Sequence, residues 1–402
     1  MKKNNSQFLA KIQFLNLSKL LFLIKYLFYY FDKLLCFFIK KPKKVTKKKK
    51  ILLMANLGLG DAINFLSVTG KYRKLYPKNH YEITLLVPNG FQDLFREECD
   101  FEKIIPINFN LAVTNLFHRF KLIKLINCEY YDTLIDIMGA TGAAINVYLS
   151  SASYAKEKIT IQNCAYSICP SFLVEKAYTK VYKINEPHIS NVEYYNFLFD
   201  FIANKKTPIN LHKTKDYKIT VPLPNKYYIV FPGASSSFRK WDLDRYVELI
   251  KKIYKKTSLP VLFCGTNVDL DSVNYLMDHL DKKQYKNILG CTNMLEFIQV
   301  IKKASFIITN DTGSYHIAVN EEVPVALITG CYALDMYALY NFLDDKYRKP
   351  YVIYKNKSCK NCFYKCPYIK KGDKIWPCLN EIDVNDAFKV VSNMINDLGI
   401  CK

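Results

Sequence analysis

The chain has 402 residues, half of them hydrophobic, which is enough to bury the cores of two or three domains. Its net charge of +22 is uneven, because residues 1–50 hold 14 lysines and one aspartate (+13) and the other 352 residues carry only +9. This distribution argues against a nucleic-acid binder, whose folded part would carry the basic patch, and favours contact with an acidic membrane surface.

Thirteen cysteines in a chain of this length, without a convincing signal peptide, favour buried, reduced thiols in a reducing cytoplasm. A disulfide framework is more typical of short secreted chains. We therefore expect the fold to depend on hydrophobic burial.

Residues 8–40 are rich in Leu, Ile, Phe and Tyr, and their polar positions recur about every seven residues. These positions are Lys11, Ser18 with Lys19, Lys25, Asp32 with Lys33, and Lys40. Seven residues return nearly to one helical face, so the pattern predicts an amphipathic helix lying in the bilayer interface with a narrow polar stripe. A spanning helix would need about 20 apolar residues in a row. A span and a soluble or partner-bound helix remain the alternatives.

The lysine-rich residues 40–50 follow as a solvated linker that also suits anionic headgroups. We expect this linker to separate the membrane-associating helix from the folded part, with residues 1–50 forming one unit. A plain charged spacer is the alternative interpretation.

A strand, a glycine turn and a helix open the first predicted domain, residues 51–205. The strand covers residues 51–57, and Gly58, Gly60 and Asp61 precede a helical pattern that reaches about residue 75. Two glycines let a backbone approach a ligand closely, and Asp61 stands at a helix start facing the expected cleft. The third glycine of a dinucleotide fingerprint is missing, so no nicotinamide site is predicted.

Strands and helices then alternate, as in a parallel, doubly wound sheet. Strands are expected over residues 81–87, 104–106 and 131–137, and helices over 116–127 and 188–203. The polar, proline-bearing residues 205–225 mark the boundary to a second domain, residues 226–385.

The second domain begins with a strand over residues 227–231 and a loop of small polar residues. This loop carries Ser235, Ser236, Arg239 and Lys240, which bring hydroxyl groups and two cations to one place. Such a loop can bind a diphosphate, although serine-rich loops are often plain connections.

Residues 305–330 are the most informative stretch, and they predict a strand, a loop, a helix and a strand. The two apolar runs, 306–309 and 325–328, are short and rich in β-branched residues, as buried parallel strands are. A helix starting after Asp311 points free N–H groups and a positive dipole end at the loop, which suits a diphosphate. The candidate ligand residues are Asp311, Thr312, Gly313 and, one helical turn later, His316. The alternative is that Asp311 only caps the helix and His316 packs against it.

These motifs resemble a known family. Asn-Asp-Thr-Gly-x-x-His-x-Ala followed by Val-Pro-Val-Ala-Leu is similar to the nucleotide-sugar motif of glycosyltransferase family nine, the lipopolysaccharide heptosyltransferases. Pro-Gly-Ala-Ser and Arg-Lys-Trp at residues 232–241 resemble further elements of that family, and Gly60-Asp61 matches its Gly-Asp pair. The resemblance spans about residues 51–398. It implies an α/β fold of the GT-B type, with two Rossmann-like domains facing a cleft, to which this chain adds an N-terminal amphipathic membrane-associating helix.

The resemblance also implies roles for the candidate residues. Asp61 would be the general base, with Gly58 and Gly60 on the acceptor side. The donor would contact Ser235, Ser236, Arg239, Lys240, Asp269, Asp311, Thr312, Gly313 and His316. Asp269 would bind ribose or base, although its alignment is uncertain by about one residue, and either Arg239 or Lys240 would contact the phosphate.

The implied activity is inverting transfer of a sugar, heptose from ADP-heptose, to a lipopolysaccharide core acceptor in a bacterium. The enzyme would need no cofactor beyond its nucleotide-sugar donor and would bind a glycolipid at the cytoplasmic face of the inner membrane. A transferase for another nucleotide sugar and a non-catalytic membrane-bound scaffold of the same fold are the alternatives.

Cys359, Cys362, Cys366 and Cys378 have a spacing that is typical of zinc or iron–sulfur sites. They also resemble a cysteine-bearing tail of many family members whose catalysis is not thought to need it, so a structural metal is a candidate. A last helix over residues 383–398 is expected to pack back across the domains, and residues 386–402 are taken as a separate tail.

Overall fold

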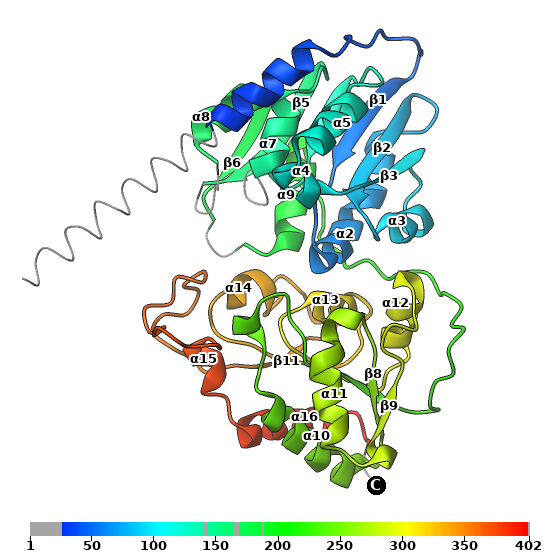
Figure 1. The fold of residues 1–402 in the computed structure, drawn as a ribbon. Helices are drawn as coiled ribbons and strands as arrows, with labels where there is room; N and C mark the ends of the chain where they lie inside the picture. Colours follow the sequence, from blue (N-terminus) through cyan, green and yellow to red (C-terminus); the bar gives the residue numbers. More distant parts are fainter. Residues whose placement is uncertain (1–25, 140–143, 165–168, 187–188, 401–402) are drawn as a thin grey trace, which may run out of the picture.

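The computed structural model describes residues 26–139, 144–164, 169–186 and 189–400. The chain forms two α/β domains, one above the other in Figure 1, and each is built on a six-stranded parallel sheet. This confirms the α/β class and the two-domain arrangement predicted from the sequence.

The first sheet has the strand order β3-β2-β1-β4-β5-β6. Its strands are β1 (Lys49–Met54), β2 (Tyr81–Pro88), β3 (Lys103–Ile107), β4 (Thr133–Asp136), β5 (Glu157–Asn163) and β6 (Lys180–Ile184). The order reverses between β1 and β4, so a crevice forms outside the carboxyl end of β1, where open α/β sheets bind ligands.

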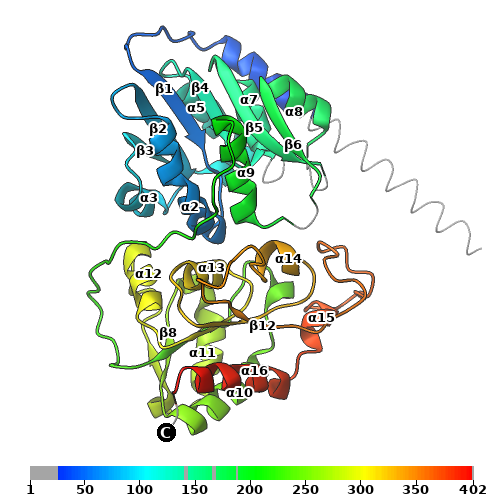
Figure 2. The ribbon, with the colours of Figure 1, turned by 180° about the vertical axis from the view of Figure 1, so that it is seen from behind.

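Helices cover both faces of this sheet. One face carries α2 (Leu59–Leu75), α3 (Gln92–Glu98) and α9 (Asn191–Ala203), which share one hydrophobic core. The other face carries α4 (Phe109–Thr114), α5 (Leu116–Ile126), α7 (Ala144–Ser151) and α8 (Ser171–Ala177), together with the helical residues 26–37. Figure 2 shows the first face toward the viewer.

The second sheet has the order β12-β11-β10-β7-β8-β9. Its strands are β7 (Tyr228–Phe231), β8 (Val261–Phe263), β9 (Tyr285–Asn287), β10 (Ile307–Thr309), β11 (Val325–Ile328) and β12 (Tyr351–Ile353). Its main helices are α10 (Leu243–Thr257), α11 (Leu270–Asp278), α12 (Met294–Lys302), α13 (Gly313–Asn320) and α16 (Val384–Asp397), with short helices α14 (Leu334–Tyr337) and α15 (Pro377–Asn380). The order reverses between β7 and β10, so the two predicted phosphate loops leave neighbouring strands.

The last helix does not cross the domains as expected. Helix α16 packs against α10, β11 and β12, and its apolar residues belong to a core of the second domain. The prediction of a separate tail from residue 386 is therefore wrong for the described residues up to 400. Apolar residues at helical spacing, such as Ala387, Val391 and Met394, bury fully on this domain alone.

The helical residues 26–37, which we call the N-terminal helix, pack on the first domain. They are not held apart from it by a linker. Asp32 was predicted to lie on a polar stripe, but it is fully buried and its carboxylate pairs with Arg119 of α5 at 2.8 Å. Burial raises the pKa of Asp32 to about 6, although the charge of Arg119 opposes this shift. The Arg119 guanidinium also lies 4.7 Å from the ring centroid of Phe28. Seven-residue periodicity identified one helical face but not the side that meets the protein.

Residues 40–50 also follow the domain surface. Lys44 pairs with Asp132 at 2.7 Å, and the Lys41 ammonium group lies 6.0 Å from the ring centroid of Tyr154. The predicted free spacer is therefore a bound segment. Of the interfacial helix predicted over residues 8–40, the part up to residue 25 lies outside the described residues, and none of the described helices is long and apolar enough to cross a membrane.

The two domains touch where α2 meets α13, at the carboxyl edges of both sheets. A Cβ atom on Gly60 would lie 2.3 Å from the ring of His316, and one on Gly313 would lie 2.7 Å from Leu59. Residues 205–225 contain no helix or strand and link the domains, with His212 bonded to Glu98 at 2.7 Å and the Thr214 amide to Glu321 at 2.9 Å. Two glycines thus allow the contact that defines the cleft.

We predict that Arg119→Met lowers the free energy of unfolding by about 3–5 kcal/mol, because it leaves the Asp32 carboxylate buried without its partner. The double variant Asp32→Asn with Arg119→Met should recover most of this loss, as measured by urea unfolding. Lys44→Met removes an exposed ion pair and should cost less than about 1 kcal/mol. Equal losses for Arg119→Met and Lys44→Met would contradict the role of the buried pair.

We predict that Gly60→Ala destabilises the protein by about 1–3 kcal/mol, since the new methyl group meets His316 across the domain contact. Gly70 lies in the same helix, and a Cβ atom added there would have no neighbouring atom within 4 Å, so Gly70→Ala should raise stability by up to about 1 kcal/mol. Thermal unfolding of the two variants gives the comparison. A stabilising Gly60→Ala substitution would show that the domains do not meet at this point.

Candidate functional site

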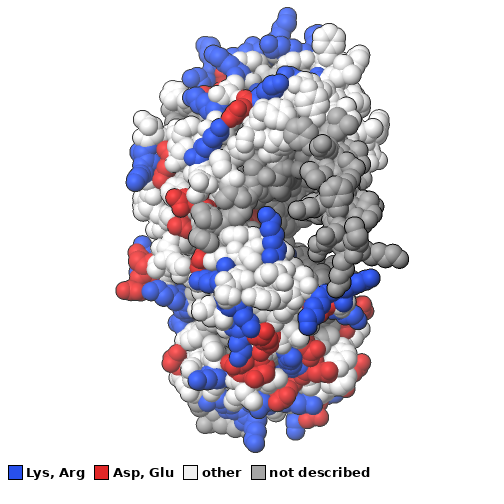
Figure 3. Space-filling model, turned by 90° about the vertical axis from the view of Figure 1, so that its left-hand side faces the viewer, with Lys and Arg blue, Asp and Glu red and all other residues white. Residues whose placement is uncertain are grey.

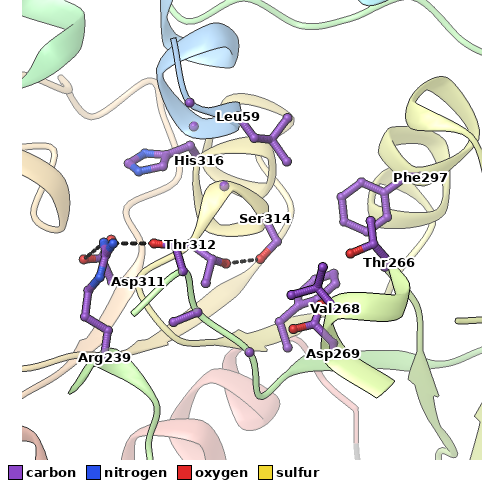
Figure 4. A pocket seen from close by; sticks show the side chains of 18 of the residues that line it. Leu59, Arg239, Thr266, Val268, Asp269, Phe297, Asp311, Thr312, Ser314 and His316 are labelled. Atoms are coloured by element: carbon purple, nitrogen blue, oxygen red, sulfur yellow. Dashed lines mark hydrogen bonds and ion pairs between the residues drawn. The ribbon is translucent and has the colours of Figure 1, made fainter. Parts of the chain in front are cut away.

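A cleft of about 670 Å³ lies between the carboxyl edges of the two sheets. The first domain contributes Gly58, Leu59, Gly60 and Asp61, and the second contributes residues that include Ser235, Arg239, Asp269, Asp311, Thr312, Gly313, Ser314 and His316. Figure 4 shows Leu59 of the first domain beside the cleft residues of the second, among them His316, Thr312 and Ser314. The structure therefore brings most of the predicted site residues together.

Asp61 lies in the first turn of α2 and is held by groups from another helix. The Asn191 side-chain amide of α9 donates to its carboxylate, and the Tyr195 hydroxyl and Gly58 amide stabilise the carboxylate as well. Burial raises the pKa of Asp61, and the charge of Asp311 across the cleft raises it further. A carboxylate with a raised pKa and a fixed orientation is suited to accept a proton.

Asn191 and Tyr195 were missed by the sequence analysis. Both lie in the helix that was interpreted only as packing, about 130 residues after Asp61. Asn191 is the first residue of α9, directly after the N-cap Ser190, whose capping box with Glu193 fixes where the helix begins. Their helical spacing of four residues places them on one face, but no local pattern indicates the carboxylate they reach.

Asp311 and Arg239 form an ion pair on the opposite side of the cleft. An Arg239 guanidinium nitrogen lies 3.2 Å from the Asp311 carboxylate, which also accepts a 3.0 Å hydrogen bond from the Tyr332 hydroxyl. Arg239 also donates to the Ser235 hydroxyl. One cation is therefore positioned next to a hydroxyl group at the cleft surface, as phosphate binding requires.

The N-terminus of α13 opens into the same region. Thr312 occupies the N-cap position, and its hydroxyl pairs with that of Ser314 at 2.6 Å. In the described structure no side chain caps α13, so Asp311 does not have the simple capping role considered as an alternative. Backbone N–H groups at a helix start, with the positive end of the helix dipole, favour an anion here.

Lys240 and Ser236 are separated from this anion site. Neither is among the residues that line the cleft. The charge of Lys240 instead lowers the pKa of Asp269, although burial dominates and raises that pKa. Of the two candidate cations, Arg239 is therefore the one at the anion site.

Asp269 lies at the other end of the cleft. Its carboxylate packs so closely on Gly233 that a Cβ atom there would lie 1.8 Å away. Thr266, Val268 and Phe297 surround it, and Figure 4 shows this group apart from Arg239 and Asp311. A polar carboxylate beside apolar surface is suited to a nucleoside.

Asn310 joins the two phosphate loops, a role that the sequence analysis did not assign. Its buried amide donates to the Pro232 carbonyl at 2.7 Å and accepts from the Trp241 amide at 3.2 Å and the Tyr246 hydroxyl at 2.9 Å. A satisfied buried amide of this kind fixes the loops relative to each other. The position of Arg239 therefore depends on Asn310.

The proton of His316 can be assigned from its neighbours. The side-chain oxygen of Asn320 accepts from the His212 backbone amide, and its side-chain nitrogen donates to the His316 carbonyl. These two bonds fix the orientation of the Asn320 amide, so the same nitrogen must donate to the side-chain oxygen of Asn64. The Asn64 oxygen also accepts from the Tyr340 hydroxyl, so Tyr340 must accept from His316 Nδ1 at 2.6 Å. Burial lowers the pKa of His316 to about 4. His316 is therefore neutral at pH 7, and its Nε2 is an acceptor at the cleft.

The fold keeps Cys362 near the other three predicted cysteines and brings Cys331 to the same place. The thiols of Cys359 and Cys378 lie beside that of Cys331, which raises the pKa of Cys331. The pKa of Cys378 is lowered because the Cys331 thiol and nearby backbone N–H groups stabilise its thiolate. Cys331 was not among the predicted residues, and its partners lie 28 and 47 positions later. Among the described residues, no group of three or more His, Cys, Asp or Glu side chains is arranged to hold a metal ion.

Taken together, the cleft places a positioned base on one domain and an anion site on the other. Asp61 can take a proton from a bound hydroxyl group, while Arg239 and the α13 amides stabilise a phosphorylated leaving group. This arrangement suits transfer of a group from a phosphorylated donor to a hydroxyl acceptor.

Comparison with known proteins finds one family over part of the chain. Residues 187–330 match the family described as Glycosyltransferase family 9 (heptosyltransferase). No curated protein matches the chain. The matched segment includes both phosphate loops and Asn191, but not Asp61.

Solved structures with this fold cover nearly the whole chain. The ADP-heptose lipopolysaccharide heptosyltransferase II of E. coli is 16% identical, with a TM-score of 0.62 over 87% of this chain and 99% of that one. A family 9 glycosyl transferase from Veillonella parvula is also 16% identical, with a TM-score of 0.67 over 89% and 100%. E. coli heptosyltransferase WaaC with ADP-2-deoxy-2-fluoro heptose is 15% identical, with a TM-score of 0.60 over 86% and 99%. These likenesses show a GT-B fold like that of the heptosyltransferases.

Proposed function

We propose that the chain transfers a sugar, heptose from ADP-heptose, to a lipopolysaccharide core acceptor, because residues 187–330 match the glycosyltransferase family 9 (heptosyltransferase) model. The observation that carries the proposal is the opposition of Asp61 to Arg239 and the α13 N-terminus across one cleft. A hydroxyl acceptor and a diphosphate donor can meet between them.

The donor is proposed from the chemistry of the second domain and from the relatives. WaaC of E. coli has been solved with ADP and with ADP-2-deoxy-2-fluoro heptose. In this chain the diphosphate would lie at Arg239, Ser235 and the α13 amides, and the nucleoside would extend toward Asp269 and Phe297. His316 would accept a hydrogen bond from a hydroxyl group of the sugar or acceptor through Nε2.

The proposed reaction is a single displacement. The acceptor oxygen attacks the anomeric carbon of the donor while Asp61 takes its proton, and the bond from that carbon to the phosphate oxygen breaks on the opposite face. The anomeric configuration inverts, and the electron pair leaves with the diphosphate. Arg239 and the α13 amides stabilise the new charge, so the proposed step uses no metal ion.

Two alternatives to this function can be compared with the site. A donor with another sugar fits equally well, because the identified contacts are made with the diphosphate and the nucleoside. A non-catalytic scaffold is disfavoured by the hydrogen bonds that hold Asp61 in place, since a binding surface does not require a positioned base.

We also propose that the enzyme works at the cytoplasmic face of the membrane, and that the tail cysteines have a structural role, with or without a metal.

The direct test uses purified full-length protein, a deacylated lipopolysaccharide core and a panel of ADP-, GDP- and UDP-sugars. We expect selective release of ADP from ADP-heptose together with a product enlarged by one heptose. Transfer from another sugar nucleotide would change the proposed donor but leave the proposed site unchanged. Absence of hydrolysis and transfer with all donors would favour the scaffold.

We predict that Asp61→Asn lowers kcat by about 10² to 10⁴-fold, because the general base is lost. Binding of ADP, measured by calorimetry, should stay within about twofold, since the second domain holds the nucleotide. Asp132→Asn removes a carboxylate of the same domain that pairs with Lys44 and should leave kcat unchanged. Full turnover by folded Asp61→Asn would refute the assignment of the base.

We predict that activity falls on acidification as Asp61 becomes protonated, at a pH above the ordinary aspartate pKa of 3.8 because burial raises its pKa. Asn191 stabilises the ionised form, so Asn191→Ala should raise the pKa further and move the acidic limb of kcat/KM to higher pH. Tyr195→Phe should move it in the same direction. A limb that stays in place in both variants would show that another group limits the rate at low pH.

A further inference from the structure

The helical residues 26–37 expose a row of apolar side chains, of which Tyr30 also contacts the domain by accepting a 3.2 Å hydrogen bond from Lys176 of α8. Leu27, Tyr30, Leu34 and Phe37 follow each other at intervals of three and four residues, and they are 37% to 81% exposed. We call these four residues the outward face. The opposite side of the same helix is buried against the domain through Tyr29 and other residues. A helix in a soluble protein normally turns polar residues outward, so this second apolar face requires a partner.

A second group of exposed apolar residues lies where α4 meets α5. Leu111, Val113, Leu116 and Phe117 are 40% to 69% exposed, and we call them the α4–α5 ridge. The side chains of Asn108 and Asn115 cap the two helices, so the turn that exposes the ridge is defined. The Lys121 ammonium group lies 4.5 Å from the ring centroid of Phe117. An apolar side chain beneath a lysine is suited to a headgroup boundary.

The outward face and the ridge belong to one layer of the first domain. Arg119 of α5 reaches Asp32 in the middle of the N-terminal helix, and α4 packs on α5 and α7. Figure 1 shows the N-terminal helix and α4 and α5 on the same side of the first sheet. Ten of the 17 exposed large hydrophobic side chains in the described part of the chain lie in residues 26–38 and 111–117. An apolar concentration of this kind marks an interaction surface.

The charge beside this surface indicates the kind of partner. Residues 26–50 hold nine lysines and one aspartate, and Lys33, Lys40 and Lys41 are exposed next to the outward face. Figure 3 shows Lys and Arg side chains outnumbering acidic ones at the top of the first domain. Apolar side chains bordered by lysines match a bilayer surface that contains anionic lipid, because the chains enter the interface and the lysines meet the headgroups.

We propose that the outward face and the α4–α5 ridge together form a membrane-docking surface on the first domain, with anionic phospholipid as its partner. Two contacts define an orientation as well as an attachment. They hold the domain that carries Asp61 against the lipid, independently of which sugar the enzyme transfers.

The test places a tryptophan at each contact of the full-length chain, which has only two native tryptophans. Phe37→Trp and Phe117→Trp are compared with Tyr368→Trp, an exposed aromatic position on the second domain. With phosphatidylglycerol vesicles containing brominated lipid, both first-domain variants should show quenching well beyond that of the wild type, and Tyr368→Trp should not. Quenching at Phe37→Trp and Phe117→Trp no greater than at Tyr368→Trp would overturn the proposal.

Serine substitutions supply the second measurement. Leu34→Ser with Phe37→Ser, and Leu116→Ser with Phe117→Ser, should each weaken vesicle binding by about tenfold, because two apolar side chains no longer enter the interface. The control pair, Leu270→Ser with Ile369→Ser, removes two exposed apolar groups from the second domain and should have no effect. Transfer to a soluble deacylated acceptor should be unchanged in all three. A different result would be a dimer in sedimentation that the first two serine pairs dissociate, with no quenching by lipid. That result would assign the surface to contact with a second copy of the chain and would contradict membrane docking.

Discussion

The site depends on how closely α2 and α13 approach each other. Gly60 meets His316 and Gly313 meets Leu59 at this contact, and neither position has room for a Cβ atom. The contact brings the carboxyl edges of both sheets to one cleft, so that a base from one domain faces an anion site on the other. It also places a neutral histidine, rather than a cation, at the junction.

The division of charge across the cleft follows from this arrangement. On the first domain, burial and the field of Asp311 favour a proton on Asp61, while Asn191 and Tyr195 oppose that effect and orient the carboxylate. On the second domain, Arg239 and the α13 dipole provide positive potential, held in register by Asn310. A reaction that moves a proton one way and a negatively charged leaving group the other uses both halves.

Much of this could be predicted from the sequence, because its signals were local. Strand–loop–helix patterns located α2, β10 and α13 within two or three residues, and resemblance to family motifs singled out Asp61, Asp311 and Arg239 as candidates, which the fold brings to one cleft. The predictions that were wrong or incomplete concern residues whose contacts are distant in the sequence. Burial of Asp32 requires Arg119, 87 residues later, and the support of Asp61 requires Asn191, 130 residues later. Periodicity finds a helical face but does not identify what it meets, which is also why α16 was placed across the domains.

If one cleft binds the nucleotide diphosphate opposite Asp61, a crystal structure of the protein with ADP will show it. We expect the diphosphate within hydrogen-bonding distance of Arg239 and the α13 amides, with the adenosine near Asp269 and Phe297. The open space of the cleft should lie between the phosphate groups and Asp61. A diphosphate bound by the first domain, or outside this cleft, would rule out the proposed site.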